Sequence, residues 1–199
     1  MPHRYAELAF TPTIRALQQQ LGSRDMYARF DDGPDKHHEF RARETRFIEQ
    51  RDSVYMATVN EEGWPYLQHR GGPAGFVKIL DAHTLGFADY SGNRQYITTG
   101  NLANNTRVSL FFMDYPNRRR LKLMGRAEVL QPDDPKLRQL VDPTYPVSIE
   151  RGFLIHLVAF DWNCPQHITR RYTESDVQQL IDEAVRQALK HAQGDIPHD

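Results

Sequence analysis

Short runs of alternating apolar residues recur between Ser53 and Trp162, and this period constrains the fold more than any other feature of the sequence. Alternation at every second position is typical of a β-strand with one buried face. It runs through SVYMATV and RVSLFFMDY, and RGFLIHLVAFDWN is the most apolar segment. Turn residues such as Glu-Glu-Gly at 61–63 interrupt it at short intervals. The pattern predicts six or seven strands, mostly joined as hairpins, in an antiparallel barrel.

Helical patterns flank this section on both sides. Near the N-terminus Thr11 suits an N-cap and Pro12 the first helical position, and EFRARETRFIEQRD predicts another helix after a loop in DDGPDKH. NRQYITTGNLANNT and DDPKLRQLV each predict a short helix, and an amphipathic helix capped by Ser175 follows the barrel. We therefore predict a single domain over 1–199, of α+β (mainly β) class. It has a helical extension over 1–50, the barrel over 51–165 and a last helix over 175–193.

The balance of charged residues excludes some partners. The chain has 25 Lys and Arg against 26 Asp and Glu, so its net charge of -1 favours neither nucleic acid nor an anionic membrane.

Cys164 is the only cysteine, which rules out an internal disulfide and a multi-cysteine zinc site and suits a reducing compartment. No segment reaches the roughly 18 apolar residues of a membrane-spanning helix. We expect a cytoplasmic protein.

Three segments of the barrel section concentrate hydrogen-bond donors. In QHRGGPAGF, His69 and Arg70 lead into Gly71 and Gly72, whose bare backbones would let a flat ligand approach. The turn SGNRQ at 91–95 has the composition of a phosphate cradle, and NRRRLKL carries the densest run of cations. Each segment taken alone is more often a turn or a solvated surface than a binding site.

Taken together and in this order, the segments resemble the pyridoxamine 5'-phosphate oxidase-like family of FMN-binding split-barrel proteins. The resemblance runs from Phe47 to about Leu130, through FIEQRDSVYMATVNEEGWPYLQHR, LGFADYSGNRQYITTGNLANNTRVSLFF and RRLKLMGRAEVL. It implies a six-stranded antiparallel Greek-key split β-barrel with flanking helices. It also implies an FMN-dependent oxidoreductase that binds FMN in a cleft between the two subunits of a homodimer.

The resemblance implies roles for individual residues as well. Arg70 would contact the flavin phosphate or the ring edge, and Lys78 the phosphate. Arg120 falls near a position where the oxidases often carry Gln toward the isoalloxazine ring, and a cation there would favour an anionic reduced flavin. The full set of expected FMN-binding residues is His69, Arg70, Gly71, Gly72, Lys78, Ser91, Asn93, Arg94, Gln95 and Arg120.

The sequence offers fewer candidate residues for binding a substrate than for binding FMN. WNCPQHITRRYT differs in spacing and order from the C-terminal Arg/His set of the oxidases, and its candidates for binding a small-molecule substrate are Trp162, His167 and Arg170. Trp162 fits a core position equally well. We identify no catalytic acid or base, and no spacing typical of a metal site or a Ser-His-Asp hydrolase, so we expect no metal. A non-catalytic flavin- or haem-binding stress or sensor protein, and a deazaflavin-dependent reductase, stay open as alternatives.

Overall fold

The computed structural model describes residues 3–31 and 37–194 of the chain, with side chains up to residue 190. The chain forms two compact units. The first comprises residues 1–113 and 120–164 and contains most of the sheet, and the second comprises residues 114–119 and 165–199 and contains the last helix. Most of the predicted loop DDGPDKH lies outside the described residues.

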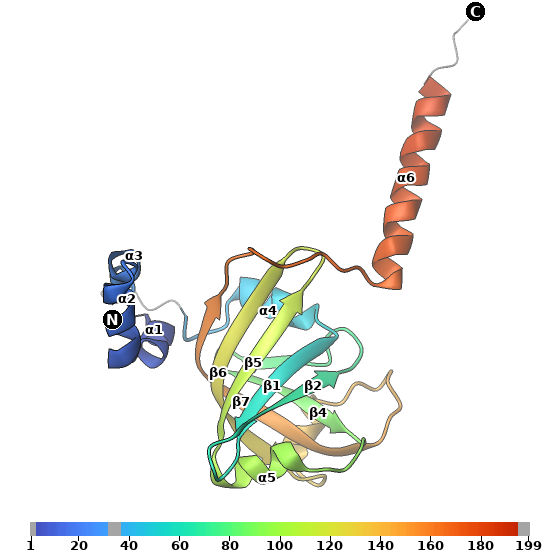
Figure 1. Cartoon of the computed structure of the whole chain (residues 1–199). Helices are drawn as coiled ribbons and strands as arrows, with labels where there is room; N and C mark the ends of the chain where they lie inside the picture. The colour runs from blue at the N-terminus through green and yellow to red at the C-terminus, as the bar shows by residue number, and fades with distance from the viewer. Residues whose placement is uncertain (1–2, 32–36, 195–199) are drawn as a thin grey trace, which may run out of the picture. The chain divides into compact units, whose positions relative to one another are not determined.

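Seven strands form one mostly antiparallel sheet in the described part of the chain (Figure 1). Their order is β2-β1-β5-β6-β7-β4-β3, so β2 and β3 are the edges. The α+β, mainly β class is confirmed by this sheet and its flanking helices, with seven strands where the family resemblance implied six. The strands span β1 Ser53–Val59, β2 Pro65–Gly71, β3 Lys78–Asp81, β4 Thr84–Tyr90, β5 Arg107–Asp114, β6 Arg119–Leu130 and β7 Ile149–Trp162.

The first hairpin sets the register of the edge strand β2. β1 and β2 pair from Ser53 opposite Gly71 to Val59 opposite Pro65. Gly63 in the connecting turn has φ 88°, a left-handed conformation that glycine adopts without steric cost. Because side chains alternate along a strand, one face of β2 is turned inward. That face carries Tyr66, Gln68 and Arg70.

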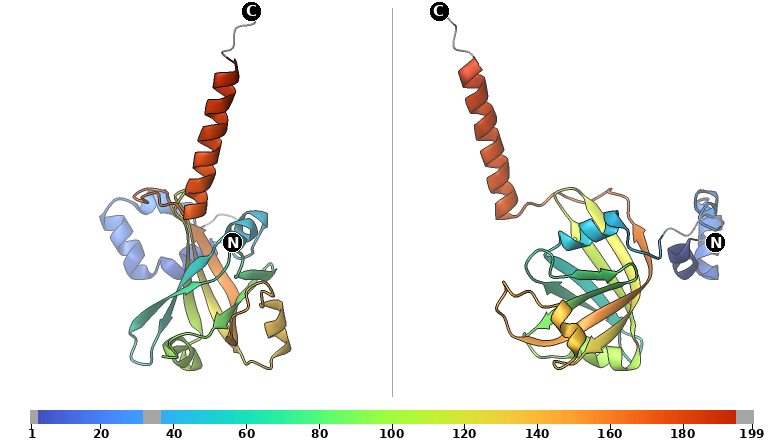
Figure 2. Two further views of the ribbon diagram at one scale, coloured as in Figure 1. Left: turned by 90° about the vertical axis from the view of Figure 1, so that its right-hand side faces the viewer. Right: turned by 180° about the vertical axis from the view of Figure 1, so that it is seen from behind.

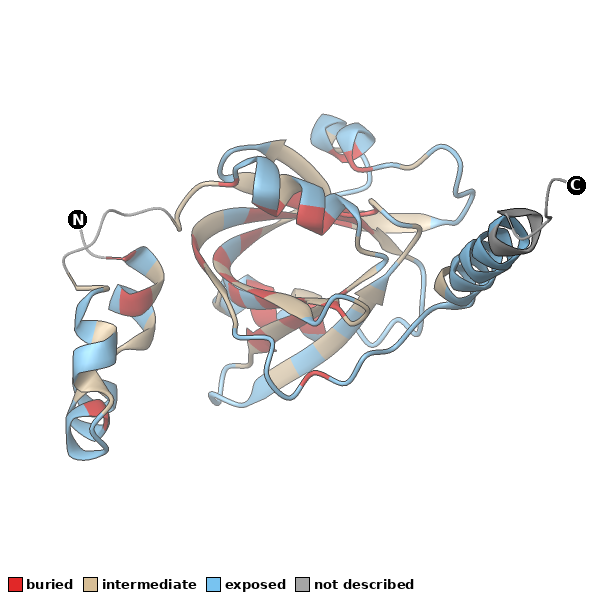
Figure 3. Ribbon diagram, turned by 90° about the horizontal axis from the view of Figure 1, so that it is seen from above, coloured by how far each residue is buried: buried red, intermediate tan, exposed pale blue. Residues whose placement is uncertain are grey.

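The long strands β6 and β7 curve the sheet around its core (Figure 2). They pair from Leu121 opposite Trp162 to Leu130 opposite Gly152. The buried residues lie inside the curve, and the helix α4 (Ala42–Glu49) contributes its own apolar face to them (Figure 3). The largest fully buried side chains include Phe47, Phe76, Phe87, Phe112, Phe153 and Phe160.

Shorter helices accompany the sheet. The predicted N-terminal extension contains α1 (Arg4–Ala9), α2 (Pro12–Gln20) and α3 (Arg24–Ala28). Thr11 caps α2 as predicted, because its hydroxyl accepts the backbone N–H of Ile14 at 3.4 Å. The predicted helix after β4 is α5 (Ile97–Asn104), whereas DDPKLRQLV forms the short 3-10 helix η1 (Pro135–Gln139).

The second unit consists mainly of α6 (Glu174–Gly194). Ser175 is not its cap: the hydroxyl of Thr173 accepts the N–H of Asp176 at 3.1 Å, and the Asp176 carboxylate accepts the N–H of Thr173 at 2.8 Å. The predicted apolar stripe is about half exposed, from 44% at Val177 to 58% at Leu189. Among the helices described, none combines the length and the hydrophobicity that a bilayer-spanning segment needs.

Candidate functional site

A small polar cavity lies where β2, the end of β4 and the start of α5 meet, and we call it the donor pocket. Its volume is about 60 Å³. Four of the residues expected to bind FMN line it together: Arg70, Asn93, Arg94 and Gln95. The wall also includes Asp89, Tyr96, Thr99 and Glu150.

Asp89 is the electrostatic centre of the donor pocket. It lies on β4 directly opposite Arg151 of β7. Its carboxylate oxygens lie 2.5 Å from Nη1 of Arg70 and 3.3 Å from Nε of Arg151, and the three side chains are between 12% and 20% exposed. Burial raises the pKa of the Asp89 carboxyl, and the two guanidinium groups oppose that shift. Asp89 therefore fixes the Arg70 guanidinium in the pocket wall and links it to Arg151, which is not among the described residues of the lining.

The loop after β4 holds two non-glycine residues in the left-handed conformation. Their φ angles are 58° at Arg94 and 56° at Tyr96. Such residues are uncommon, and each costs on the order of 1 kcal/mol or more. Nε of Arg94 donates to the Tyr96 hydroxyl at 2.9 Å, and the N–H of Gln95 donates to Oδ1 of Asn93 at 3.2 Å. Backbone strain of this kind is concentrated at binding and catalytic sites.

The helix α5 begins in the wall of the donor pocket. Residues 97–99 of its first turn line the cavity. Its N-cap residue, Tyr96, makes no side-chain capping hydrogen bond within the described structure. The first N–H groups of an uncapped helix are ready donors for an anion. Buried Asn101 donates from Nδ2 to the Thr58 hydroxyl at 2.9 Å, which fixes α5 on β1.

Arg70 also borders a second cavity, with a volume of about 160 Å³. His69 and Gly71, two further residues of the expected set, line this cavity. The Arg70 guanidinium lies 5.4 Å from the centre of the Phe153 ring. Its Nε is buried and has no hydrogen-bond partner among the described residues. The ion pair with Asp89 therefore leaves one donor of Arg70 without a partner in the described structure.

Ser91 is not among the described residues that line the donor pocket, but it contacts one that does. Its hydroxyl donates to the Glu150 carboxylate at 3.0 Å, and Nη2 of Arg151 holds the other Glu150 oxygen at 2.5 Å. These contacts lower the pKa of Glu150, the hydrogen bond from Ser91 most strongly. The Ser91 hydroxyl has one hydrogen to donate, so a phosphate would compete with Glu150 for it.

Gly72 is required by packing within the chain. A Cβ at this position would lie 2.8 Å from Cβ of Phe76 and 3.1 Å from Cε2 of Tyr90. The side chains of Phe76 and Tyr90 fill the space where a Cβ of residue 72 would lie. The glycine allows Phe76 and Tyr90 to pack against the chain. The approach of a flat ligand to the backbone of Gly72 stays a prediction.

Lys78 and Arg120 are not among the described residues that line the donor pocket or the second cavity. The pKa of the Asp142 carboxyl is lowered, mainly by hydrogen bonds from Thr144 and in smaller part by the charge of Lys78. Arg120 lies on β6, where its carbonyl accepts the N–H of Asn163 at 3.3 Å. The roles of Lys78 and Arg120 toward FMN stay predictions.

Trp162 packs at the end of β7. Its ring meets the ring of Phe47 edge-on at 4.7 Å, and its Nε1 donates to the Glu44 carboxylate at 2.8 Å. These contacts fit the core position that the sequence left open for Trp162. His167 and Arg170 are exposed residues of the second unit, and their role as substrate-binding residues stays a prediction.

Three charged residues were missed in the sequence, two that line the donor pocket and one that pairs with both of them. They lie at the ends of β4 and β7, which are far apart in the chain but pair directly in the sheet. A signal was present, because charged residues interrupt the otherwise apolar segments LGFADY and IERGF. The missed residues are Asp89, Glu150 and Arg151.

Comparison with known proteins gives a family. The family model described as pyridoxamine 5'-phosphate oxidase matches residues 40–152, more than half of the chain. The pyridoxine/pyridoxamine 5'-phosphate oxidase of Photorhabdus laumondii is 35% identical over 80 residues, which cover 40% of this chain and 33% of that protein. The chain thus spans about a third of the length of this curated relative.

Solved structures of other proteins also align with the chain. HupZ of Group A Streptococcus aligns with a TM-score of 0.48 and 15% identity, covering 67% of this chain and 100% of that chain. An FMN-binding protein of Syntrophomonas wolfei aligns with a TM-score of 0.47 and 8% identity, covering 76% of this chain and 95% of that chain. The segment matched by the family model runs from just before α4 into β7 and includes every residue that lines the donor pocket. The chain therefore belongs to the pyridoxamine 5'-phosphate oxidase family.

Proposed function

We propose that this protein binds FMN and acts as an FMN-dependent oxidoreductase, with the cofactor phosphate in the donor pocket. The observation that carries the proposal is the convergence of Arg70, the Arg94 loop and the first turn of α5 on one cavity. Membership of the family supports an oxidoreductase, because the curated relative is a pyridoxine/pyridoxamine 5'-phosphate oxidase.

The donors of the pocket suit a phosphate dianion. Guanidinium groups bind phosphate oxygens through charge-assisted hydrogen bonds, and the start of α5 adds backbone N–H donors and the positive end of a helix dipole. Arg70 and Arg94 line the pocket together with the carboxylates of Asp89 and Glu150. Arg151 is not in the lining, but it pairs with both carboxylates and adds a third guanidinium charge to the group. The local charge therefore favours an anion, although the net charge of the whole chain is -1.

The donor pocket is too small for a whole flavin. Its volume of about 60 Å³ compares with roughly 300–1,000 Å³ for sites that enclose a small organic ligand. We infer that the ring extends beyond the pocket and is covered by a second copy of the chain in a homodimer. Exposed apolar side chains on β2 and in the pocket wall support this inference, since Leu67 is 63%, Tyr96 44% and Ile97 39% exposed.

The residues of this chain would bind and orient the cofactor. FMN supplies hydride or electron transfer when it is bound. Arg70 and Arg94 would hold its phosphate, and Asp89 positions Arg70 through their ion pair. We propose a small-molecule substrate, and the curated relative makes pyridoxamine 5'-phosphate the first compound to test.

Titration with FMN and with riboflavin tests the phosphate site. Riboflavin has the same ring without the phosphate, so a phosphate site predicts tighter binding of FMN. Arg94→Ala should weaken FMN binding by about 1.5–3 kcal/mol, roughly tenfold to a hundredfold, and should leave riboflavin binding unchanged. The matched control is Arg107→Ala, which removes an exposed arginine of β5 outside the donor pocket. An equal loss for both ligands, or no loss for FMN, would contradict the phosphate assignment.

Turnover separates an enzyme from a flavin carrier. Anaerobic bleaching of bound flavin by a reduced nicotinamide or by pyridoxamine 5'-phosphate, followed by reoxidation in air, would support the oxidoreductase. Flavin binding without any bleaching would support the non-catalytic alternative, and a preference for a deazaflavin over FMN would support the reductase. Sedimentation of the FMN-loaded protein tests the homodimer, because a monomer that retains FMN would contradict a shared site.

A further inference from the structure

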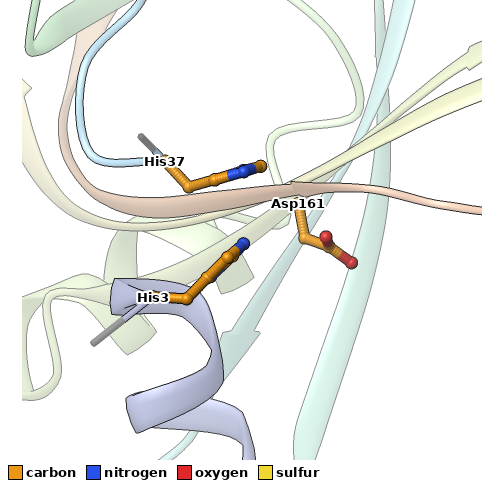
Figure 4. A group of neighbouring side chains, drawn as sticks. All are labelled: His3, His37 and Asp161. Carbon is orange, nitrogen blue, oxygen red and sulfur yellow. The ribbon is translucent and has the colours of Figure 1, made fainter. Parts of the chain in front are cut away.

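Two histidines and an aspartate from three separate segments meet beside α1 (Figure 4). His3 immediately precedes α1, His37 lies between α3 and α4, and Asp161 is on β7. One ligand atom from each residue lies within 4.8 Å of the other two. All three residues belong to the first unit, and none is among the described residues that line the donor pocket.

Backbone hydrogen bonds hold the three residues in place. The N–H of His3 donates to the carbonyl of Phe30 at 2.9 Å. The carbonyl of His37 accepts the N–H of Phe160 at 2.9 Å, so His37 lies beside the strand residue that precedes Asp161. These bonds therefore fix the segment of His3 beside Phe30 and the segment of His37 beside β7.

The two imidazole rings of the cluster are in direct contact. They stack with their centres 3.9 Å apart and 28° between their planes. Burial, and next the neighbouring His3, lower the pKa of His37, so its ring is neutral near pH 7. His3 is 6% exposed, and its Nδ1 is buried without a hydrogen-bond partner among the described residues. A buried polar atom without a partner is costly, and coordination by a metal ion would remove that cost.

Acidic and basic side chains both lie near the two histidines. Asp161 supplies a carboxylate, and Glu44 is close enough to act on the pKa of His37. Lys122 opposes them, with its Nζ 3.4 Å from Oδ2 of Asp161 and 4.8 Å from the centre of the Tyr5 ring. The Lys122 and Asp161 side chains are 28% and 29% exposed, so the ammonium group can turn toward water. Lys122 is therefore a competitor that a bound cation must displace.

A cavity of about 450 Å³ opens beside the cluster. His3 and Asp161 lie in its wall, and its size is typical of sites for small organic ligands. Three protein ligands leave coordination positions of a metal ion open, and a water molecule or a ligand would reach them from this cavity. Aromatic side chains form much of the remaining wall: Tyr5, Phe10, Tyr27, Phe30 and Trp162.

We propose that His3, His37 and Asp161 form a binding site for one divalent transition-metal ion of the Zn²⁺ type, with its open positions toward this cavity. Two imidazoles and one carboxylate are donors that suit Zn²⁺ and the neighbouring first-row metals. We expected no metal site because local histidine spacing showed none, and local spacing cannot reveal ligands that come from distant segments. The site is separate from the proposed FMN site.

Metal titration of the 199-residue chain tests the proposal, with protein that carries no histidine tag and has been stripped by a chelator. Calorimetric titration with Zn²⁺ should give one site per chain, and Co²⁺ should add the visible absorption of a protein-bound complex. His37→Ala should weaken binding at least tenfold, since changes to residues behind the ligands already cost roughly 10- to 100-fold. His38→Ala removes the adjacent histidine, which is outside the cluster, and should bind like the unmodified protein.

The variant Lys122→Gln is expected to gain affinity for Zn²⁺, a change that loss of the fold would not produce. Removal of the ammonium that competes for Asp161 should tighten Zn²⁺ binding, whereas Asp161→Asn should weaken it. Far-UV circular dichroism verifies the fold of each variant. The proposal is overturned if the unmodified protein binds neither Zn²⁺ nor Co²⁺. It is equally overturned if the His37→Ala and His38→Ala variants bind Zn²⁺ with the same affinity.

Discussion

The variant Asp89→Asn tests the charge arrangement of the donor pocket. The change keeps the shape of the side chain and removes its charge. The Arg70 guanidinium then loses the carboxylate 2.5 Å away, whereas Arg151 keeps its contact with Glu150. Both arginine side chains are at most 20% exposed, so water replaces the lost partner poorly.

The distances and the burial give the expected cost. At an effective dielectric constant of about 20, two unit charges about 4 Å apart attract each other by about 4 kcal/mol. Loss of one partner from a buried ion pair costs roughly 3–5 kcal/mol in proteins. Because the amide can still accept a hydrogen bond and Arg151 retains Glu150, we expect the lower end. The free energy of unfolding should fall by about 3 kcal/mol.

Urea denaturation followed by tryptophan fluorescence measures this loss. The matched control is Glu128→Gln, because Glu128 pairs with Lys136 at 2.9 Å while their side chains are 40% and 51% exposed. An exposed pair of this kind contributes less than about 1 kcal/mol. FMN should then stabilise the Asp89→Asn variant more than the unmodified protein, since its phosphate meets a guanidinium charge that no carboxylate neutralises.

Two results would refute this reasoning. A loss of less than about 1 kcal/mol in the Asp89→Asn variant would mean that Arg70 is already well solvated, as in an exposed ion pair. An equal stabilisation of both proteins by FMN would mean that Arg70 does not face the bound phosphate. The first result concerns the pocket wall, and the second concerns the ligand.

Three further predictions concern packing and pH. Gly72→Ala should lower the free energy of unfolding by about 1–3 kcal/mol, because the new methyl group meets Phe76 and Tyr90; unchanged stability would show that this region repacks freely. Gly100→Ala within α5 should raise it by about 0.5–1 kcal/mol, since no described atom lies within 4 Å of the new Cβ, and a loss would contradict the open helix surface. The pKa of His37 lies below its ordinary 6.5, so the unfolded chain takes up the proton first and the free energy of unfolding should decrease as the pH falls through 6.5. We expect denaturation with a chelator present to show that the free energy of unfolding falls less steeply with pH in His37→Gln than in the unmodified protein. The two slopes should differ by at most about 1.4 kcal/mol per pH unit, and identical slopes would exclude this effect.

Local pattern was sufficient to predict most elements of the fold. Each predicted strand is present, because a strand with one buried face must alternate in polarity whatever its neighbours are. Thr11 and Pro12 mark the start of α2 for an equally local reason. The cap of α6 was assigned wrongly, since Thr173 and Ser175 are both good N-cap residues and the choice depends on the backbone geometry around Asp176.

The donor pocket could be predicted only in part. Arg70 and the turn at 91–95 are recognisable as donors, and the structure brings Arg70 and residues 92–95 to one cavity. The side chain that holds Arg70 in place, Asp89, was missed although it interrupts the apolar segment LGFADY, and Lys78 could not be separated from the residues that do line the pocket. Nothing in the segment QHRGGPAGF indicates that Phe76 packs onto Gly72.

The sequence by itself determined the strands, the helices and the family, because these depend on periodicity and on short ordered motifs. The tertiary structure alone decided which side chains meet. Asp89 contacts Arg151 because β4 pairs with β7, and His3 reaches Asp161 because α1 packs against the same strand. The physical reason is that alternation is a local property, whereas the pairing of distant segments is set by burial of the whole core.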